Sequence, residues 1–283
     1  MHYVIGDVHG CYDEMIAMIT NIEKIDKDAQ FIFTGDFVDR GNKVKETLDW
    51  VMNNITANGK YQSVKGNHED MLIDWYNIYK KEYKYYRIPK TYFDFDKLAE
   101  TLKFNQVTAY IEKMRSLPDI IIKNINDEEF HIVHAWDRGD YYQKAGYTDK
   151  KIAEDRLWNR DEENNLMDKN IDFIIIHGHT PTILCEAFIG YDYNDDVFFS
   201  HSGEVLKKKY SYNVDCGCTF GKNAKLYGIK ENICKLASLC LETKDVYYII
   251  PETLNFIKEK AFDLCPFGVM YSEENDYELK NNV

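Results

Sequence analysis

The chain has 283 residues, of which 45% are hydrophobic and 29% charged, so it can bury a substantial core within one large domain. Its 35 Lys and Arg face 48 Asp and Glu, and the resulting formal charge of −13 argues against bulk binding of nucleic acid or of an anionic membrane. The longest apolar runs, such as 173–176, are too short to cross a bilayer. With no signal peptide before the first strand and no CxxC pair among seven cysteines, we predict a cytoplasmic protein with reduced thiols.

The first half of the chain is predicted to alternate strands and helices. Short β-rich runs at 2–5, 31–34 and 61–65 each end in a polar cluster that contains glycine. Apolar residues at helical spacing predict two amphipathic helices between them, marked by Met15, Met18, Ile19, Ile22 and Ile25 and then by Val44, Leu48, Val51 and Ile55. Each cluster therefore follows the carboxyl end of a strand, where open α/β sheets bind ligands.

The second half is predicted to be richer in strands. Residues 70–117 have helical periodicity and form an insertion with many aromatic and basic side chains. Strands are expected at 120–123, 130–134, 173–177, 212–216, 226–229 and 246–250, and the acidic tail 272–283 is expected to be flexible. This pattern predicts one α/β (α+β) domain over residues 1–271, a four-layer αββα sandwich of two mixed β-sheets flanked by helices.

Two acidic clusters indicate a metal site. Asp7 and His9 in GDVHG (6–10) are two residues apart, so both can project to the same side of an extended segment and bind one ion. Asp36 in GDFVDRG (35–41) follows a buried strand, where a carboxylate is costly unless it meets cations, and a bridging position between two ions resolves that cost. Arg40 in the same cluster presents a planar fork suited to phosphate oxygens.

Three further clusters add neutral ligands. They are GNHE at 66–69, the strand end at His134 and HGHTP at 177–181, and they supply Asn67, His134 and His179. A mixture of nitrogen and oxygen ligands suits Mn²⁺, Fe or Zn²⁺ better than Ca²⁺ or Cu(I). The sequence therefore predicts two divalent metal ions, with Mn²⁺ expected first, at the carboxyl edge of the strands.

The five motifs, in this order and across residues 3–230, resemble the phosphoprotein-phosphatase branch of the calcineurin-like metallophosphoesterases. This branch includes bacterial and phage serine/threonine protein phosphatases and diadenosine tetraphosphate hydrolases. The resemblance implies a set of roles: Asp7 and His9 bind the first metal, Asp36 bridges, and Asn67, His134 and His179 complete the second metal, while His68 is the general acid, Asp39 orients it, and Arg40 and Arg160 clamp the phosphate.

Two positions depart from the pattern of this branch. The fourth motif commonly reads His-Ala-Gly, and Trp136 stands here in place of the glycine, where it could narrow the pocket or stack on a substrate. His177 matches no ligand of the branch and is interpreted as structural. Arg160 is assigned because Leu157-Trp158-Asn159-Arg160 resembles the segment that carries the second clamping arginine.

The resemblance implies hydrolysis of phosphate monoesters by direct attack of a metal-bridging hydroxide, without a phosphoenzyme. The first expectation is a serine/threonine-type protein phosphatase, whose partner is a phosphorylated protein. The alternative is a hydrolase of dinucleoside polyphosphates such as diadenosine tetraphosphate, or of RNA 5′ ends. A non-catalytic phosphate-binding module is the remote alternative, because it should lack some of the ligands.

The segment 75–95 leaves the substrate open. It interleaves six tyrosines with Lys80, Lys81, Lys84, Arg87 and Lys90. Such a stretch could form a cap that binds a phosphopeptide or stacks a nucleotide base. It could equally be an amphipathic surface helix whose tyrosines pack inward.

Overall fold

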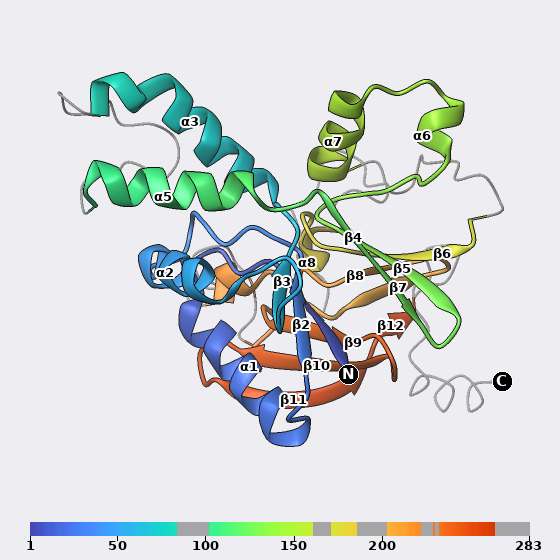
Figure 1. Cartoon of the computed structure of the whole chain (residues 1–283). Helices are drawn as coiled ribbons and strands as arrows, with labels where there is room; N and C mark the ends of the chain where they lie inside the picture. The colour runs from blue at the N-terminus through green and yellow to red at the C-terminus, as the bar shows by residue number, and fades with distance from the viewer. Residues whose placement is uncertain (84–101, 161–170, 186–202, 222–228, 230–231, 264–283) are drawn as a thin grey trace, which may run out of the picture.

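The computed structural model describes residues 1–83, 102–160, 171–185, 203–221, 229 and 232–263 (Figure 1). Two six-stranded sheets pack against one another, and helices cover the first sheet and flank the second, which gives the predicted αββα sandwich. Among the described residues, every helix falls short of the length and apolarity needed to cross a membrane.

The first sheet joins the beginning of the chain to its end, in the order β11-β10-β9-β1-β2-β3. Its members are β1 (His2–Ile5), β2 (Gln30–Phe33), β3 (Tyr61–Ser63), β9 (Leu236–Cys240), β10 (Asp245–Ile250) and β11 (Asn255–Lys260). The strands β1, β2 and β3 are parallel, whereas β9, β10 and β11 are antiparallel to their neighbours. The sheet is therefore mixed, as predicted.

The second sheet has the order β12-β7-β8-β6-β5-β4. Its members are β4 (Ile120–Ile125), β5 (Glu128–Val133), β6 (Phe173–His177), β7 (Leu206–Lys208), β8 (Ser211–Asn213) and β12 (Phe262–Asp263). Here β5, β6 and β8 are parallel, and β4 and β7 run antiparallel to them. Each sheet thus contributes three parallel strands whose carboxyl ends can meet at one edge.

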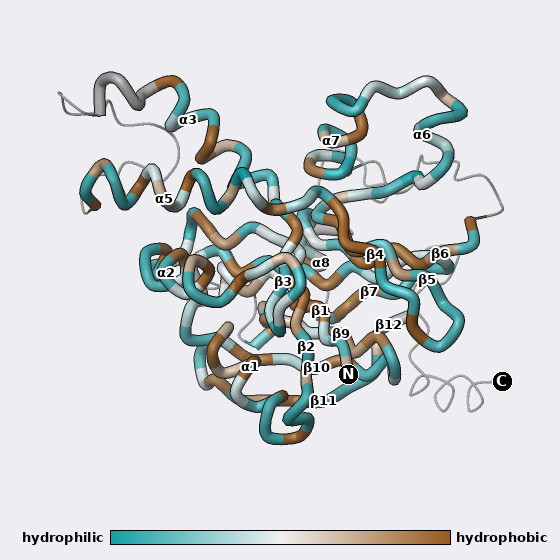
Figure 2. Tube along the Cα trace, in the orientation of Figure 1, coloured by the Kyte–Doolittle hydropathy of each residue, from teal (hydrophilic) through white to brown (hydrophobic). Residues whose placement is uncertain are grey.

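The helices follow the strands that they connect. They are α1 (Tyr12–Ile25), α2 (Val44–Asn54), α3 (Asn67–Tyr83), α5 (Phe104–Arg115), α6 (Tyr141–Lys144), α7 (Asp149–Trp158) and α8 (Thr182–Cys185). Helices α1 and α2 cover the first sheet, α3 packs against α5, and α6 and α7 lie together beyond β5 (Figure 1). Apolar residues gather on strands such as β4 and β5, while the hairpin loop that joins them is polar (Figure 2).

The side chains of β1 alternate between the two faces of the first sheet and so contribute to two hydrophobic cores. Tyr3 and Ile5 face the core between the first sheet and its helices, whereas Val4 faces the core between the two sheets, where it meets Ile132 and Leu239. Successive side chains of a strand point to opposite faces, so a short apolar strand can serve two cores. Tyr3, Val4 and Ile5 are fully buried, so the strand is fixed from both sides.

Most predicted elements are confirmed, with some differences. Ile25, expected on the buried stripe of α1, is 58% exposed because the helix ends there. The helix expected from residue 70 begins at Asn67, so that GNHE forms its first turn. The strand expected at 212–216 is shorter, and β7, β9, β11 and β12 had not been predicted. Residues 84–101 of the insertion, 226–228 and the tail lie outside the described residues.

Candidate metal centre

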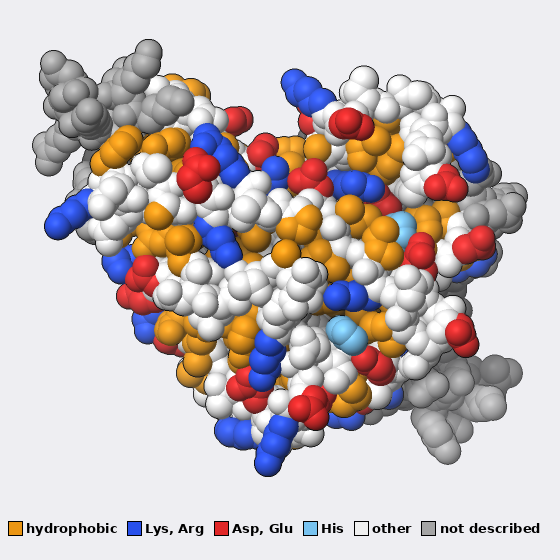
Figure 3. All heavy atoms as spheres, viewed as in Figure 1, with side chains coloured by type: hydrophobic (Ala, Val, Ile, Leu, Met, Phe, Trp, Pro, Cys, Tyr) orange, Lys and Arg blue, Asp and Glu red, His pale blue; other side chains and the backbone are white. Residues whose placement is uncertain are grey.

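The predicted site residues come together at the carboxyl ends of the parallel strands. Asp7 follows β1, Asp36 follows β2, Asn67 follows β3, His134 follows β5 and His179 follows β6. The loops after β5 and β6 and the first turn of α3 meet near the centre of the molecule (Figure 1). Above them, the surface is hollowed between the α3–α5 pair and the α6–α7 pair (Figure 3).

Asp36 is shared by two groups of side chains whose ligand atoms lie within 4.8 Å of one another. One group contains His9 and His68, and the other contains Asp7 and His134. Its Oδ2 lies 3.3 Å from Nε2 of His9 and 3.5 Å from Nε2 of His134. Asp36 therefore stands between the two clusters, as a bridging carboxylate must.

The second cluster brings acceptor atoms against one another. Nδ1 of His134 lies 2.8 Å from the carbonyl oxygen of Thr34, which places its proton on Nδ1 and leaves a lone pair on Nε2. That Nε2 lies 2.7 Å from Oδ1 of Asn67 and 3.1 Å from Nδ1 of His179. An imidazole lone pair and an amide oxygen repel at this distance unless a cation lies with them, so these residues fit a metal ion.

The first cluster has the same chemistry with an arginine over it. Nδ1 of His9 donates to the carbonyl oxygen of Val38 at 2.9 Å, so its Nε2 is an acceptor. Arg40 donates to this Nε2 at 2.9 Å and to Nε2 of His68 at 3.1 Å. An ion bound by His9 therefore requires Arg40 to turn away from that nitrogen. Asp39 contacts Nδ1 of His68 at 2.9 Å, as the orienting role implies.

The loops of the site hold unusual backbone conformations. Among the described residues, ten with side chains have positive φ, and five of these belong to the site: His9, Asp36, Asp39, Arg40 and His179. Left-handed backbone is disfavoured for residues with a Cβ and persists only where the surroundings enforce it. Such strain is concentrated at functional sites, and here it aims the side chains of three separate loops at one point.

Glu69 enforces the conformation of the Asp36 loop. Its buried carboxylate accepts hydrogen bonds from the backbone amides of Asp36, Phe37 and Val38, and from that of Gly66. The amide of His68 in turn donates to Oδ1 of Asp36 at 2.9 Å. The loops after β2 and β3 are thus joined by one side chain, which sequence reasoning had placed in a motif without giving it a role.

Two glycines are required by the close approach of the carboxylates. A Cβ at Gly66 would lie 2.2 Å from Oδ1 of Asp36, and a Cβ at Gly178 would lie 2.1 Å from Oδ1 of Asp7. Asp7 also accepts from Thr34 Oγ1 at 2.8 Å and from the amide of His179 at 3.0 Å. Asp7 therefore ties the loop after β6 to the first sheet.

Burial sets the charge states of the site. It raises the pKa of Asp7, with help from the charges of Asp215 and Asp36, and it raises the pKa of Asp36 beside Glu69. Burial likewise lowers the pKa of His9 well below its usual range and that of His134 to about 3. Neutral imidazole is the form that binds metals, and carboxylates in such surroundings keep their charge at neutral pH only beside cations.

Asp215 is a further site residue that sequence reasoning passed over. It follows β8, the sixth parallel strand end, is buried, and hydrogen-bonds to Asp7. Burial raises its pKa to about 6 although Arg40 and Arg160 stand near. Asp215 lies within the strand predicted at 212–216, and nothing in its local sequence marked it as part of the site.

Arg160 lies at the edge of the site, and Trp136 does not line it. Nη1 of Arg160 donates to Oγ1 of Thr180 at 3.0 Å, next to His179, and its side chain is exposed. Trp136 is buried, packs against Val133 and Ile175, and meets the ring of His177 edge-on at 5.4 Å. The idea that this indole stacks on a substrate is therefore wrong, because it is part of the core behind the site.

Other predictions concern residues outside the centre. His131 contacts Asp137 and Glu129, and His2 contacts Glu242, so both have the structural roles expected of them, while His201 lies outside the described residues. Of the segment 75–95, the structure describes 75–83, and Trp75 and Tyr76 pack into the core as the amphipathic interpretation expects. Cys216 and Cys218 are buried free thiols.

Comparison with known proteins decides the family. The family profile described as calcineurin-like phosphoesterase matches residues 3–214. The chain belongs to the calcineurin-like phosphoesterases. It is 26% identical to serine/threonine-protein phosphatase 2 of Salmonella typhimurium over 198 residues, which cover 68% of this chain and 85% of that protein.

Two other similarities extend this picture of a calcineurin-like phosphoesterase. A symmetrical bis(5′-nucleosyl)-tetraphosphatase of Klebsiella pneumoniae subsp. pneumoniae is 40% identical over 71 residues, a match that covers 25% of this chain and 24% of that enzyme. A mutant of a cold-active protein tyrosine phosphatase has a similar structure, with a TM-score of 0.51, 18% identity and coverage of 91% of this chain and 79% of that one. The second similarity concerns the fold alone.

Proposed function

We propose that this calcineurin-like phosphoesterase is a serine/threonine-type protein phosphatase that hydrolyses phosphate monoesters with two divalent ions. The observation that carries the proposal is the position of Asp36, whose Oδ2 faces His9 of one cluster and His134 of the other. The similarity to a serine/threonine-protein phosphatase over 85% of that protein supports the protein substrate.

The roles of the residues follow from their contacts. Asp7, His9 and Asp36 would hold the first ion and Asp36, Asn67, His134 and His179 the second, with Mn²⁺ expected from the ligand set. When bound, such ions supply a water of lowered pKa and positive charge for the phosphate. The residues around them supply the remaining chemistry.

Arg40 and Arg160 would bind the phosphate oxygens, where negative charge is concentrated. Arg40 now donates to His9 and His68, so binding a phosphate releases both imidazoles. His68, fixed through Nδ1 by Asp39 at 2.9 Å, would then take up a proton from water at Nε2 and pass it to the departing oxygen, a contribution of about 10²–10⁴-fold. No side chain of the centre is placed in the role of a covalent nucleophile.

The test is a panel of substrates on purified protein. A phosphoserine peptide, diadenosine tetraphosphate and 5′-triphosphorylated RNA are compared with Mn²⁺ present, and bound metal is measured alongside. We expect hydrolysis of the phosphopeptide with about two metal ions per chain. Turnover confined to the dinucleotide would overturn the protein substrate and favour the alternative that the partial tetraphosphatase similarity suggests.

A further inference from the structure

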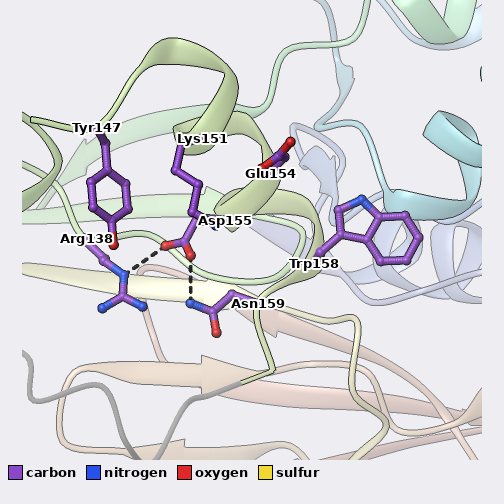
Figure 4. Close-up of a pocket in the computed structure, with 7 residues that line it drawn as sticks. All are labelled: Arg138, Tyr147, Lys151, Glu154, Asp155, Trp158 and Asn159. Atoms are coloured by element: carbon purple, nitrogen blue, oxygen red, sulfur yellow. Dashed lines mark hydrogen bonds and ion pairs between the residues drawn. The ribbon is translucent and has the colours of Figure 1, made fainter.

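A second polar pocket lies beside the metal centre, along α7 (Figure 4). We call this cavity of about 590 Å³ the α7 pocket. Trp158, the last residue of α7, forms its wall nearest the centre, because its ring centroid lies 6.3 Å from that of His179. Its indole is 43% exposed and projects from the end of α7 away from Arg138 (Figure 4). An exposed indole beside a phosphate site is a ready surface for the rest of a substrate.

The far side of the α7 pocket holds a fixed guanidinium. Nε of Arg138 donates to the buried carboxylate of Asp155 at 2.8 Å, and Asp155 also accepts from Tyr142 and Asn159. The two terminal nitrogens of Arg138 make no hydrogen bond within the described part of the chain. A guanidinium that is held by one nitrogen and open at the other two is preorganised for an anion.

The charges of the α7 pocket favour a negative group. Lys151 is exposed and forms no ion pair with any residue that the structure describes. Glu154 lies 3.8 Å from Lys150, and Asp155 is paired with Arg138. The lining thus has two cations and two carboxylates, and both carboxylates are already engaged by other groups. Lys151 and the terminal nitrogens of Arg138 are therefore left to meet a negative group.

The spacing along α7 sets how far this charge lies from the centre. Lys151 and Trp158 are seven residues apart on one helix, so they share a face at a separation of about 10 Å. An extended peptide rises about 3.3 Å per residue, so this separation corresponds to about three residues. A dinucleoside polyphosphate keeps its anionic groups at the metal centre and extends an uncharged base beyond them, which would leave Lys151 without a partner.

We propose that the α7 pocket binds an acidic side chain of a phosphopeptide, about three residues from the phosphorylated residue, with the intervening chain lying over Trp158. This specificity rests on the protein phosphatase activity proposed above. It adds a selection for acidic sequence context that the metal centre itself does not provide.

The experiment uses the full chain with Mn²⁺ and three phosphoserine peptides. One has Glu three residues before the phosphoserine, one has Glu three residues after it, and one has Ala at both positions. The variants are Lys151→Glu and Trp158→Ala. Lys144→Glu is the matched control, since Lys144 is an exposed lysine of the neighbouring helix α6 that does not line the pocket. p-Nitrophenyl phosphate reports on the centre itself.

We expect one Glu peptide to exceed the Ala peptide in kcat/KM by about five- to tenfold, mainly through KM. Lys151→Glu should abolish this preference and Lys144→Glu should retain it. Trp158→Ala should raise KM for all three peptides. Equal preferences in Lys151→Glu and Lys144→Glu, or no preference in the natural chain, would overturn the α7 pocket as a peptide subsite. Turnover of p-nitrophenyl phosphate in the same samples would show that the phosphatase activity itself is retained.

Two further outcomes are informative. Hydrolysis of diadenosine tetraphosphate that depends on Trp158 but not on Lys151 would assign the indole to a nucleoside and contradict the peptide subsite. Failure to hydrolyse any phosphomonoester with two metal ions bound would overturn the proposed function, and this inference with it.

Discussion

The effect of Asp36 on the stability of the fold depends on whether cations are bound beside it. Its buried carboxylate lies near Glu69, and both burial and that charge raise its pKa. Its oxygens also face two imidazole nitrogens that present lone pairs. The residue is therefore unfavourable for the fold and necessary for binding ions, a combination expected at a functional site.

We therefore predict that Asp36→Asn stabilises the chain without metal and destabilises it, relative to the natural chain, when metal is bound. In the presence of a chelator we expect the variant to melt about 2–4 °C higher than the natural chain, because a buried charge is removed while Oδ1 still accepts from the amide of His68. With Mn²⁺ the order should reverse, and hydrolysis should fall by about 100-fold or more. Differential scanning fluorimetry with chelator and with Mn²⁺ measures the two melting temperatures. Full turnover by the variant would refute the bridging role.

Glu69 gives a second prediction at this scale. Glu69→Gln keeps one acceptor oxygen and leaves backbone amides of the Asp36 loop without a partner. We expect a loss of about 2–4 kcal/mol in unfolding free energy and weaker metal binding. Urea denaturation and metal titration measure the two effects. The control Glu46→Gln, on the exposed face of α2, should change neither, and equal behaviour of the two variants would contradict the assignment.

A site residue could be predicted from the sequence where its own residue type and local motif were unusual. Asp7, His9, Asp36, Asn67, His134 and His179 were predicted because histidines and carboxylates at strand ends are unusual, and the structure brings them together. Glu69, Asp215 and Thr34 could not be predicted as partners, since their importance lies in bonds to loops that are distant in sequence. Their residue types and local sequence do not distinguish them, and only the folded structure shows their contacts.

At the scale of elements, the loop after β5 is anchored to α7 by Asp137. This buried carboxylate accepts from His131 at 2.6 Å and from Nε of Arg156 at 2.8 Å, and the amide of Ala135 donates to the carbonyl oxygen of Arg156. Because His134 lies in the same segment, the anchor couples the position of α7 to the metal centre. The α7 pocket thus has a fixed place relative to the residues of the metal centre.

The anchor should make stability depend on pH. Burial alone would lower the pKa of His131, but hydrogen bonds to Asp137 and Glu129 outweigh it and raise this pKa above 6.5. A raised histidine pKa adds stability that is complete below the unfolded value and lost as pH rises through the folded one. The unfolding free energy should therefore be highest at a pH below the usual histidine pKa of 6.5 and fall at a higher pH, as the raised folded pKa is passed.

His131→Gln tests the source of this dependence. The variant should lose about 1–3 kcal/mol at the lower pH, less at the higher pH, and show a flatter profile between them. The pKa of Asp137 is held below its usual 3.8 by His131 and Arg156 against the effect of burial, so its own contribution is constant in this range and disappears only in acid. Urea denaturation at both pH values gives the result, and parallel profiles would contradict it.

Elements with one buried and one exposed face could be predicted from the sequence, whereas fully buried or very short strands could not. Helices α1 and α2 are amphipathic, and their periodic apolar stripes mark them clearly. Strand β9 has the sequence LASLC and is buried along its whole length, so it shows neither alternation nor strong β-propensity. The two-residue β12 and three-residue β7 are too short to show a pattern: β12 pairs with the distant β7, and β7 also pairs with the adjacent β8.

At the scale of the whole molecule, β9 joins the two ends of the chain. It pairs with β1 on one side and with β10 on the other. Asp7 stands directly after β1, so the first ligand depends on a strand made of residues 236–240. The five motifs end at residue 181, yet the sheet that carries three of them is completed much later.

Truncation tests this dependence. A chain that ends at residue 235 retains every predicted ligand but lacks β9, and we expect it to be insoluble or to unfold without cooperativity. A chain that ends at residue 263 retains every described strand and should unfold cooperatively. Circular dichroism and metal titration compare them. Cooperative unfolding and stoichiometric metal binding by the shorter chain would contradict the role of β9.

The αββα fold itself could be predicted from spacing and motifs, because repeated strand–helix units leave few topologies. The pairing of β9 with β1 could not, since it joins residues more than two hundred positions apart. Nor could the α7 pocket, because Arg138 and Tyr147 come from loops that no motif marks, although Trp158 and Asn159 belong to the segment that identified Arg160.

The two connections that flank the hollow of Figure 3 have a consequence for how such enzymes diversify. Helices α3 and α5 lie within the crossover from β3 to β4, and α6 and α7 lie within the crossover from β5 to β6. Strand register, which aims the ligands, is set elsewhere. Natural selection can therefore lengthen or replace the outer part of either crossover and acquire a new substrate, while the first turn of α3 and the loop at His134, which carry ligands, are inherited intact.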